Sequence, residues 1–218
     1  MQLYLFLFGG TLLMLLVMAF ANKKVHLPFG KLMICGVLLL PVGVFGTRLM
    51  RLIESGTWNG YSFYGAVFLV PVIMTILSKV LSMDTGKLLD TCAPAGCVML
   101  ALMKVNCMIT GCCYGRMIRF GRSGMAVRFP SQFTELIAGL ILLVVILKII
   151  YSEKQQGMVY AWFLFLYGSS RFLLNLLRET SPFLLGLSAG CFWSVVAVLI
   201  GGGFLILKNS RPGRNAAA

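Results

Sequence analysis

The chain contains 218 residues, of which 59% are hydrophobic and only 11% are charged, and its formal net charge is +13. A water-soluble domain of this size needs more charged side chains to cover its surface, so the composition excludes that class and indicates a membrane protein. The basic residues are spread over the loops and form no single arm or stripe, which argues against a nucleic acid partner. We expect an anionic phospholipid as the partner instead.

Seven stretches of the chain meet or approach the roughly 20 apolar residues that a transmembrane helix needs. They predict an all-α, polytopic membrane protein with about seven transmembrane helices, in one domain over residues 1–210. The first stretch has no basic region and no small-residue cleavage site, so we expect it to be retained as a helix. Residues 211–218 are expected to be a basic tail that ends in a vector-derived Asn-Ala-Ala-Ala. The predicted spans are about 1–22, 32–52, 61–82, 88–110, 131–152, 158–179 and 183–207.

The lysines predict how the bundle is oriented. Lys23 and Lys24 follow the first span and Lys208 follows the last, and with seven spans these positions share one side of the membrane. The positive-inside rule makes that side cytoplasmic, with the N-terminus outside and the C-terminus inside. The loop at 111–130 breaks the rule, because it holds Arg116, Arg119, Arg122 and Arg128. Either the topology is inverted or these arginines have a local task, and we favour the second interpretation because the inner segments agree with one another.

Ionisable residues within the spans gather toward the predicted outer ends of the helices. Lys104, Glu135 and Arg171 lie deepest, and such groups are costly in a bilayer unless they face a cavity or one another. Glu135 can pair with one cation and leave the others for an anion, and an arginine fork matches a phosphate. The spacing of Arg171, Asn175 and Arg178 puts them on one helical face. Nearer the helix ends, snorkelling to the interface is an equal alternative for Arg48, Arg51, Arg178 and Glu179.

Three of the seven cysteines cluster after the fourth span: Cys107, Cys112 and Cys113. A zinc site is poorly supported because the sole histidine, His26, lies in a loop on the other side, so we predict no metal and no cofactor. A nucleophilic or redox cysteine is one interpretation, since Lys104 and Arg116 are close enough in sequence to lower a thiol pKa. Simple packing is the other. Cys35 and Cys191 lie in apolar runs and are expected to be small buried hydrophobes.

A series of short motifs follows in order between about residues 45 and 208. Residues 46–49 read Gly-Thr-Arg-Leu, residues 62–65 read Ser-Phe-Tyr-Gly, and residues 130–135 run from Pro-Ser-Gln to a glutamate. The other motifs are Asp90 to Pro94, Leu102 to Arg116, Tyr167-Gly168 with Arg171 and Arg178, and Leu187 to Gly190 with Ser194. Each motif alone is weak. Together and in register they resemble the prolipoprotein diacylglyceryl transferase family.

That family transfers the diacylglyceryl group of phosphatidylglycerol to the thiol of a lipobox cysteine at the outer membrane face, forming a thioether and releasing glycerol phosphate. The resemblance implies a multi-pass protein of the bacterial cytoplasmic membrane, with a phosphatidylglycerol-like donor and a peptide thiol or other small nucleophile as acceptor. It implies that Arg171 binds the phosphate or stabilises charge on the leaving group, while Glu135 and Arg116 orient this cluster. The catalytic candidates are Tyr64, Lys104, Cys113, Glu135 and Arg171. The lipid-binding candidates are Arg48, Ser62, Cys107, Cys112, Arg116, Asn175 and Arg178.

Several family residues are replaced in this chain. Tyr64 stands where the family has a histidine, which removes the near-neutral base, and Lys104 replaces an arginine and loses its fork. Residues 116–130 are expected to form only a short basic loop, which suggests a different acceptor or one that is held differently. Cys107 replaces an asparagine, and Cys112 and Asn175 each replace a glutamate. Two alternatives therefore stay open: a non-catalytic lipid- or partner-binding relative, and a thiol–disulfide protein using Cys107 with Cys112 or Cys113.

Overall fold

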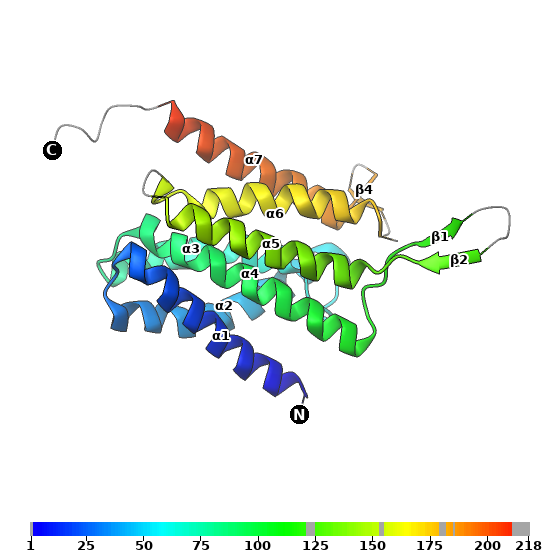
Figure 1. Ribbon diagram of the computed structural model, residues 1–218, viewed down its shortest axis with the longest axis horizontal. Helices are drawn as coiled ribbons and strands as arrows, with labels where there is room; N and C mark the ends of the chain where they lie inside the picture. Colours follow the sequence, from blue (N-terminus) through cyan, green and yellow to red (C-terminus); the bar gives the residue numbers. More distant parts are fainter. Residues whose placement is uncertain (1, 121–124, 153–154, 179–181, 185, 211–218) are drawn as a thin grey trace.

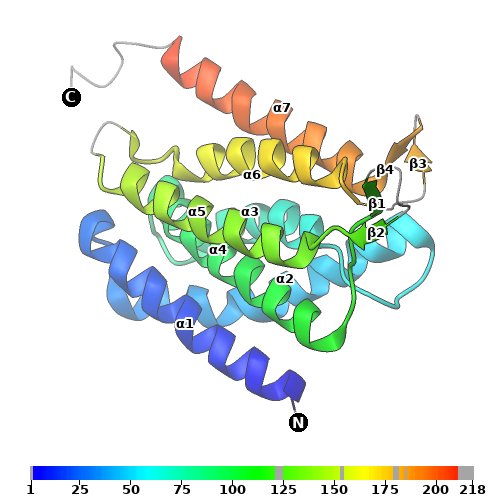
Figure 2. The same cartoon turned by 45° about the vertical axis from the view of Figure 1, so that its right-hand side comes forward.

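A computed structural model describes residues 2–120, 125–152, 155–178, 182–184 and 186–210, and within them seven helices lie side by side along the long axis of the molecule (Figure 1). Figure 2 shows α7 lying along α6 at one side of the bundle and α1 along α4 toward the other. The helices are α1 (Gln2–Val25), α2 (Phe29–Ser55), α3 (Phe63–Val80), α4 (Thr85–Thr110), α5 (Ser131–Ile150), α6 (Val159–Asn175) and α7 (Ala189–Asn209).

Six of the seven described helices are long and apolar enough to cross a membrane, which confirms the prediction of a helical, multi-pass membrane protein. The exception is α6, whose 17 residues extend about 26 Å at 1.5 Å per residue. That length is slightly less than the roughly 30 Å hydrocarbon thickness of a bilayer. The sixth predicted span therefore exists as a helix but is shorter than the sequence indicated.

The connections divide between two ends of the bundle (Figure 1). We call one the lysine end, where residues 25–29, 80–85 and 150–159 connect helices, and the other the hairpin end, where residues 55–63, 110–131 and 175–189 do so. At the lysine end, Lys31 Nζ donates to the Leu81 carbonyl at 2.7 Å and Lys208 Nζ to the Gln156 carbonyl at 2.9 Å. Lys23 and Lys24 lie in the last turn of α1, so the structure confirms that they share this end with Lys208. Which end faces the cytoplasm stays a prediction.

Short β-structure at the hairpin end corrects two expectations. The predicted basic loop contains an antiparallel hairpin of β1 (Met117–Phe120) and β2 (Met125–Arg128), which extends beyond the helices in Figure 1. In addition, α7 begins at residue 189 and not near 183, because β3 (Pro182–Leu184) pairs with β4 (Leu187–Ser188) just before it. Apolar composition alone cannot distinguish a short strand from the first turn of a helix.

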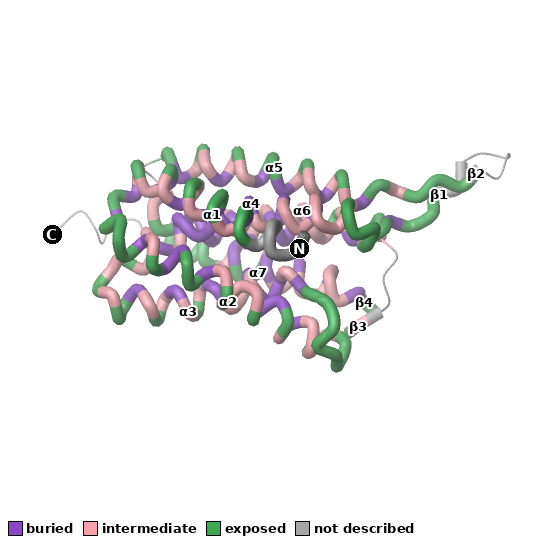
Figure 3. The backbone as a smooth tube through the Cα atoms, turned by 90° about the horizontal axis from the view of Figure 1, so that it is seen from below, coloured by how far each residue is buried: buried purple, intermediate pink, exposed green. Residues whose placement is uncertain are grey.

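Two motif glycines set the distance between α2 and α3. A Cβ on Gly65 would overlap the carbonyl oxygen of Gly46, so the two backbones touch at this crossing. The Ser62 amide also donates to the Thr47 carbonyl at 3.0 Å and fixes the start of α3 against α2. The buried stripes of the helices face one another (Figure 3), and α2 and α3 contribute to the core along most of their length.

Candidate functional site

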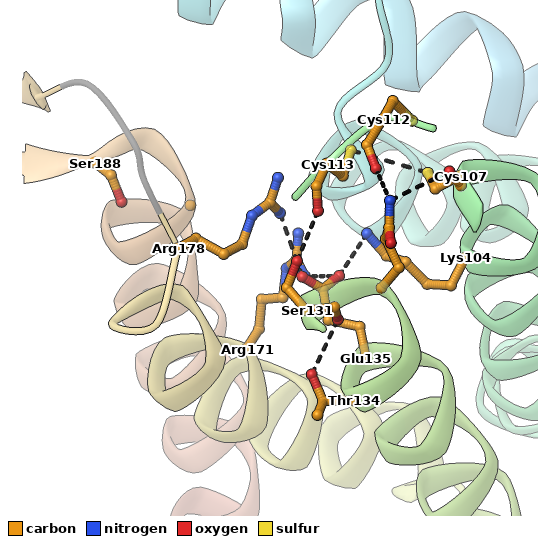
Figure 4. Close-up of polar contacts among 12 residues, drawn as sticks. Lys104, Cys107, Cys112, Cys113, Ser131, Thr134, Glu135, Arg171, Arg178 and Ser188 are labelled. Atoms are coloured by element: carbon orange, nitrogen blue, oxygen red, sulfur yellow. Dashed lines mark hydrogen bonds and ion pairs between the residues drawn. The ribbon is translucent and has the colours of Figure 1, made fainter. Parts of the chain in front are cut away.

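Four charged side chains from separate segments meet at the hairpin end. Glu135, in the second turn of α5, forms ion pairs with Lys104 of α4, with Arg171 of α6 and with Arg178. The Arg178 Nη1 to Glu135 Oε1 distance is 3.3 Å. Figure 4 shows the three cations converging on this one carboxylate. We call these four residues the Glu135 cluster.

The Glu135 cluster is buried and carries more positive than negative charge. The side chains of Glu135 and Lys104 are 3% and 8% exposed, and that of Arg171 is 14% exposed. Three cations share one carboxylate, which leaves an excess of two positive charges in a place of low dielectric constant. The Nε atoms of Arg171 and Arg178 are buried and have no hydrogen-bond partner among the described residues. Spare donors and surplus charge together favour a bound anion.

The Pro-Ser-Gln motif explains how Glu135 is positioned. Ser131 begins α5, and its Oγ donates to the Cys113 carbonyl at 2.7 Å. The Gln132 side-chain amide donates to the carbonyls of Cys107 and Cys112. These bonds attach the start of α5 to the turn that ends α4, so Glu135 faces Lys104. Ser131 and Gln132 were recognised from the sequence only as residues of a motif, without a structural role.

Two details of the predicted cluster are wrong. First, α6 ends at Asn175, so Arg178 does not continue the helical face; residues 176 and 177 form a turn, and Arg178 forms a β-bridge to Gly115. The Arg178 guanidinium still reaches Glu135 because the Arg116 amide donates to the Leu177 carbonyl at 3.1 Å and holds this segment in place. Second, Glu135 was expected to pair with one cation and leave the others free, but it contacts three. Glu179 lies outside the described residues.

Tyr64 and Ser62 lie next to the cluster but do not join it. The Tyr64 hydroxyl is buried and hydrogen-bonded to Ser194 Oγ of α7 at 2.5 Å. Ser62 Oγ donates to Glu54 Oε1 at 2.6 Å. Glu54 is a second buried carboxylate, 7% exposed, that the sequence analysis missed. Its three-residue spacing from Arg51, at the end of a span with few acidic residues, is the signal that was available for finding it.

Three other candidates are not among the ion-pair partners of Glu135. Arg48 is exposed, donates to the Tyr61 hydroxyl at 3.0 Å and lies over that ring. Arg116 has an exposed side chain and contributes through its backbone. Asn175 is buried close against Gly190 at the start of α7, and its side-chain nitrogen has no hydrogen-bond partner among the described residues. Motif membership therefore did not guarantee a place at the cluster.

The three clustered cysteines are brought together as expected. Their Sγ atoms all lie within 4.8 Å of one another, and Cys107 Sγ donates to Cys113 Sγ at 3.9 Å. This hydrogen bond lowers the pKa of the Cys113 thiol below its ordinary value; partial burial opposes the shift, and the charges of Lys104 and Arg178 add to it. Cys35 and Cys191 are buried among apolar neighbours, as predicted.

The enclosed space beside the cluster is small. A cavity of about 10 Å³ lies between α4, α5 and α6 and is lined by Leu100, Glu135, Tyr167 and Arg171 among others. It holds no more than about one water molecule, so it is far smaller than a phospholipid. A larger ligand must therefore approach from the hairpin end and displace side chains that now pair with one another.

The fold and site together define a class: a multi-pass helical membrane protein with a buried, cation-rich cluster where four of its segments meet. A family model described as prolipoprotein diacylglyceryl transferase matches residues 4–207. The chain belongs to the prolipoprotein diacylglyceryl transferase family.

Curated relatives carry the name phosphatidylglycerol–prolipoprotein diacylglyceryl transferase. One from Dehalococcoides mccartyi is 24% identical over 191 residues, covering 76% of this chain and 72% of the relative. Another, from Geobacter sulfurreducens, is 33% identical over 141 residues, covering 62% of this chain and 54% of its own length. A third, from Bordetella parapertussis, is 31% identical over 168 residues and covers 72% and 64% of the two chains.

Proposed function

We propose that the protein transfers a diacylglyceryl group from a phosphatidylglycerol-like donor to a nucleophilic acceptor at the outer face of the bacterial cytoplasmic membrane. Family membership and the names of the relatives support the reaction class. The surplus of positive charge around Glu135 is the single observation that carries the proposal. It lies at the hairpin end, opposite the lysine end that the positive-inside rule assigns to the cytoplasm.

Arg171 and Arg178 are the proposed phosphate ligands. Their Nε groups have no hydrogen-bond partner among the described residues and offer donors to an anion. Arg178, at 3.3 Å from Glu135, holds the most loosely paired guanidinium of the cluster and is the first to turn toward an arriving headgroup. Because guanidinium groups bind phosphate oxygens in pairs, two arginines suit a phosphodiester. The same cations then stabilise the second negative charge that develops when glycerol phosphate leaves.

The bond changes are those of a displacement at carbon. The acceptor sulfur forms a bond to the glyceryl carbon, the bond from that carbon to the phosphate oxygen breaks, and the thiol proton passes to water at the hairpin end. Lys104 and Glu135 hold the arginines in place throughout this step. Glu135 is a poor candidate for the proton acceptor, because its carboxylate oxygens are already occupied by three cations. Tyr64 is held by Ser194, so we assign it a positioning role.

A transfer assay tests the proposal. The purified protein is incubated with phosphatidylglycerol labelled in its diacylglyceryl group and with a lipobox peptide, and parallel reactions contain small thiol, hydroxyl or amine acceptors. We expect a labelled thioether product and one glycerol phosphate released per transfer. The Arg171→Ala variant is the inactive control. Bound phosphatidylglycerol without product in any reaction would instead identify a non-catalytic, lipid-binding relative.

A further inference from the structure

The cysteine cluster at the end of α4 has a geometry that the transfer reaction does not require. Cys107 lies in the last turn of α4, while Cys112 and Cys113 lie in the turn that follows. All three are free thiols, and their Sγ atoms lie within 4.8 Å of one another. A metal ion with bonds of about 2.3 Å to three sulfurs in one plane separates those sulfurs by about 4.0 Å. The Cys107 to Cys113 sulfur distance of 3.9 Å is close to that value.

Neighbouring residues hold this turn in its conformation. Gly111 and Cys113 both have positive φ, 65° and 61°, so the chain doubles back and returns Cys113 to Cys107. A non-glycine residue in this region is strained, and the Ser131 hydroxyl compensates by donating to the Cys113 carbonyl. Gln132 donates to the carbonyls of Cys107 and Cys112. The three sulfurs are thus preorganised by backbone contacts that leave the thiols themselves available.

We propose that Cys107, Cys112 and Cys113 form a three-thiolate binding site for a soft monovalent metal ion, best matched by Cu(I). Thiolate sulfur selects soft cations. Zinc prefers four ligands, and among the described residues no histidine or carboxylate completes the set. His26 lies at the lysine end, and the Glu135 carboxylate is occupied by three cations. A three-coordinate ion has no need of the missing ligand.

Charge also favours a monovalent ion. Three thiolates and one Cu(I) carry two negative charges, and Lys104 and Arg178 lie within electrostatic range of Cys113. The protons released from the thiols on binding go to solvent at the hairpin end, where Cys112 is exposed. Exposure of Cys112 also gives the ion a route to the site. The inference does not depend on the transferase proposal, because metal binding is measured directly.

The test is a competition for Cu(I) in detergent, without oxygen, using the coloured Cu(I)–bicinchoninate complex as the metal source. We expect the reduced protein to remove one Cu(I) per chain, with X-ray absorption showing three sulfur neighbours at about 2.3 Å. Cys107→Ala, Cys112→Ala and Cys113→Ala should each weaken binding by about ten-fold or more. Cys191→Ala is the matched control, because it removes a buried thiol outside the cluster and should bind like the wild type.

A second variant separates site geometry from folding. Gln132→Ala keeps all three thiols but removes the bonds that fix two of their carbonyls, and it should weaken Cu(I) binding by about ten-fold. Two results would overturn the proposal. One is a reduced wild-type protein that leaves the bicinchoninate complex intact. The other is binding that survives in the triple alanine variant with unchanged stoichiometry. Both measurements stand even where a single variant folds poorly.

Discussion

Glu135 and Asp90 are buried carboxylates near opposite ends of the bundle, and they are satisfied in different ways. Glu135 at the hairpin end is 3% exposed and is paired with three cations. Asp90 at the lysine end is 1% exposed and accepts backbone N–H bonds from Gly157 and Val159, at 2.5 and 2.9 Å. Both lie in the motifs on which the resemblance to the family was based. Their partners nevertheless assign them to different tasks.

Asp90 completes a local structural requirement. Met158, which precedes α6, provides no side-chain cap, and the first N–H groups of a helix need acceptors. Asp90 supplies them from α4, with a negative charge at the positive end of the helix dipole. The neutral N–H partners of Asp90 add no positive charge. At Glu135, by contrast, three cations surround one carboxylate, and a substrate anion can use the surplus positive charge. A buried acid is therefore a candidate for function when its partners leave charge unbalanced.

The largest expected effect comes from reducing the surplus charge. Arg171→Ala should lower the rate of transfer by about 10²–10³-fold, because it removes a preorganised cation from the developing charge. The thermal unfolding temperature should change little, since Lys104 and Arg178 still pair with Glu135. Arg171→Lys, which keeps the charge but not the fork, should recover part of the rate. A wild-type rate in the alanine variant would remove this residue from the site.

The next largest effect is on stability at the other carboxylate. Asp90→Ala leaves the N–H groups of Gly157 and Val159 without their acceptor, the second of them buried, and should lower the free energy of unfolding by about 2–4 kcal/mol. The rate per folded molecule should stay within about three-fold of wild type, because Asp90 contacts the start of α6 at the lysine end and not the Glu135 cluster. A three-fold change in rate corresponds to less than about 1 kcal/mol. Asp84→Ala is the matched control: Asp84 caps α4 at an exposed position, and its loss should cost about 1 kcal/mol. Equal losses for both variants would contradict the buried-cap interpretation.

A third effect concerns a motif residue at the hairpin end that carries no charge. Gly65→Ala should separate α2 from α3 and destabilise the protein by about 1–3 kcal/mol, since the added methyl group overlaps the Gly46 carbonyl. Gly9→Ala, where an added Cβ meets no atom within 4 Å, should have no such effect. Thermal unfolding in detergent measures both. An unchanged unfolding temperature for Gly65→Ala would show that the crossing is not tight.

Hydrophobic run lengths were enough to predict the helices. Six predicted spans match helices with ends within a few residues, because apolar length and composition alone determine them. The errors fall where a different interaction takes over. At the end of α6 the α-helix stops at Asn175 and the chain turns at residues 176 and 177, since residues 177 and 178 pair with the backbone of residues 115 and 116. Such pairing joins segments about 60 residues apart and leaves no local signal in a span.

The residues of the charged site were predicted from the sequence, but the ion pairs among them were not. Lys104, Glu135 and Arg171 were identified because ionisable groups deep in a span must be satisfied. That Arg178 joins them depends on a backbone bond from the hairpin, which the sequence does not display. Only depth in the span separated Arg48 from Arg171 in the sequence, and snorkelling and lipid binding stayed equal alternatives for Arg48. Their surroundings differ only once the bundle is assembled.

The smallest expected effect tests that separation. Arg48 is exposed and contacts Tyr61 through one hydrogen bond and its ring face, an arrangement worth about 1 kcal/mol or less at the surface. Arg48→Ala should therefore change the transfer rate by less than about five-fold, because 1.4 kcal/mol corresponds to a factor of ten. The comparison is made in the same vesicles as Arg171→Ala, with phosphatidylglycerol as donor. A loss approaching that of Arg171→Ala would place the Arg48 guanidinium on the lipid headgroup, and the donor site would then reach from Glu135 to the end of α2.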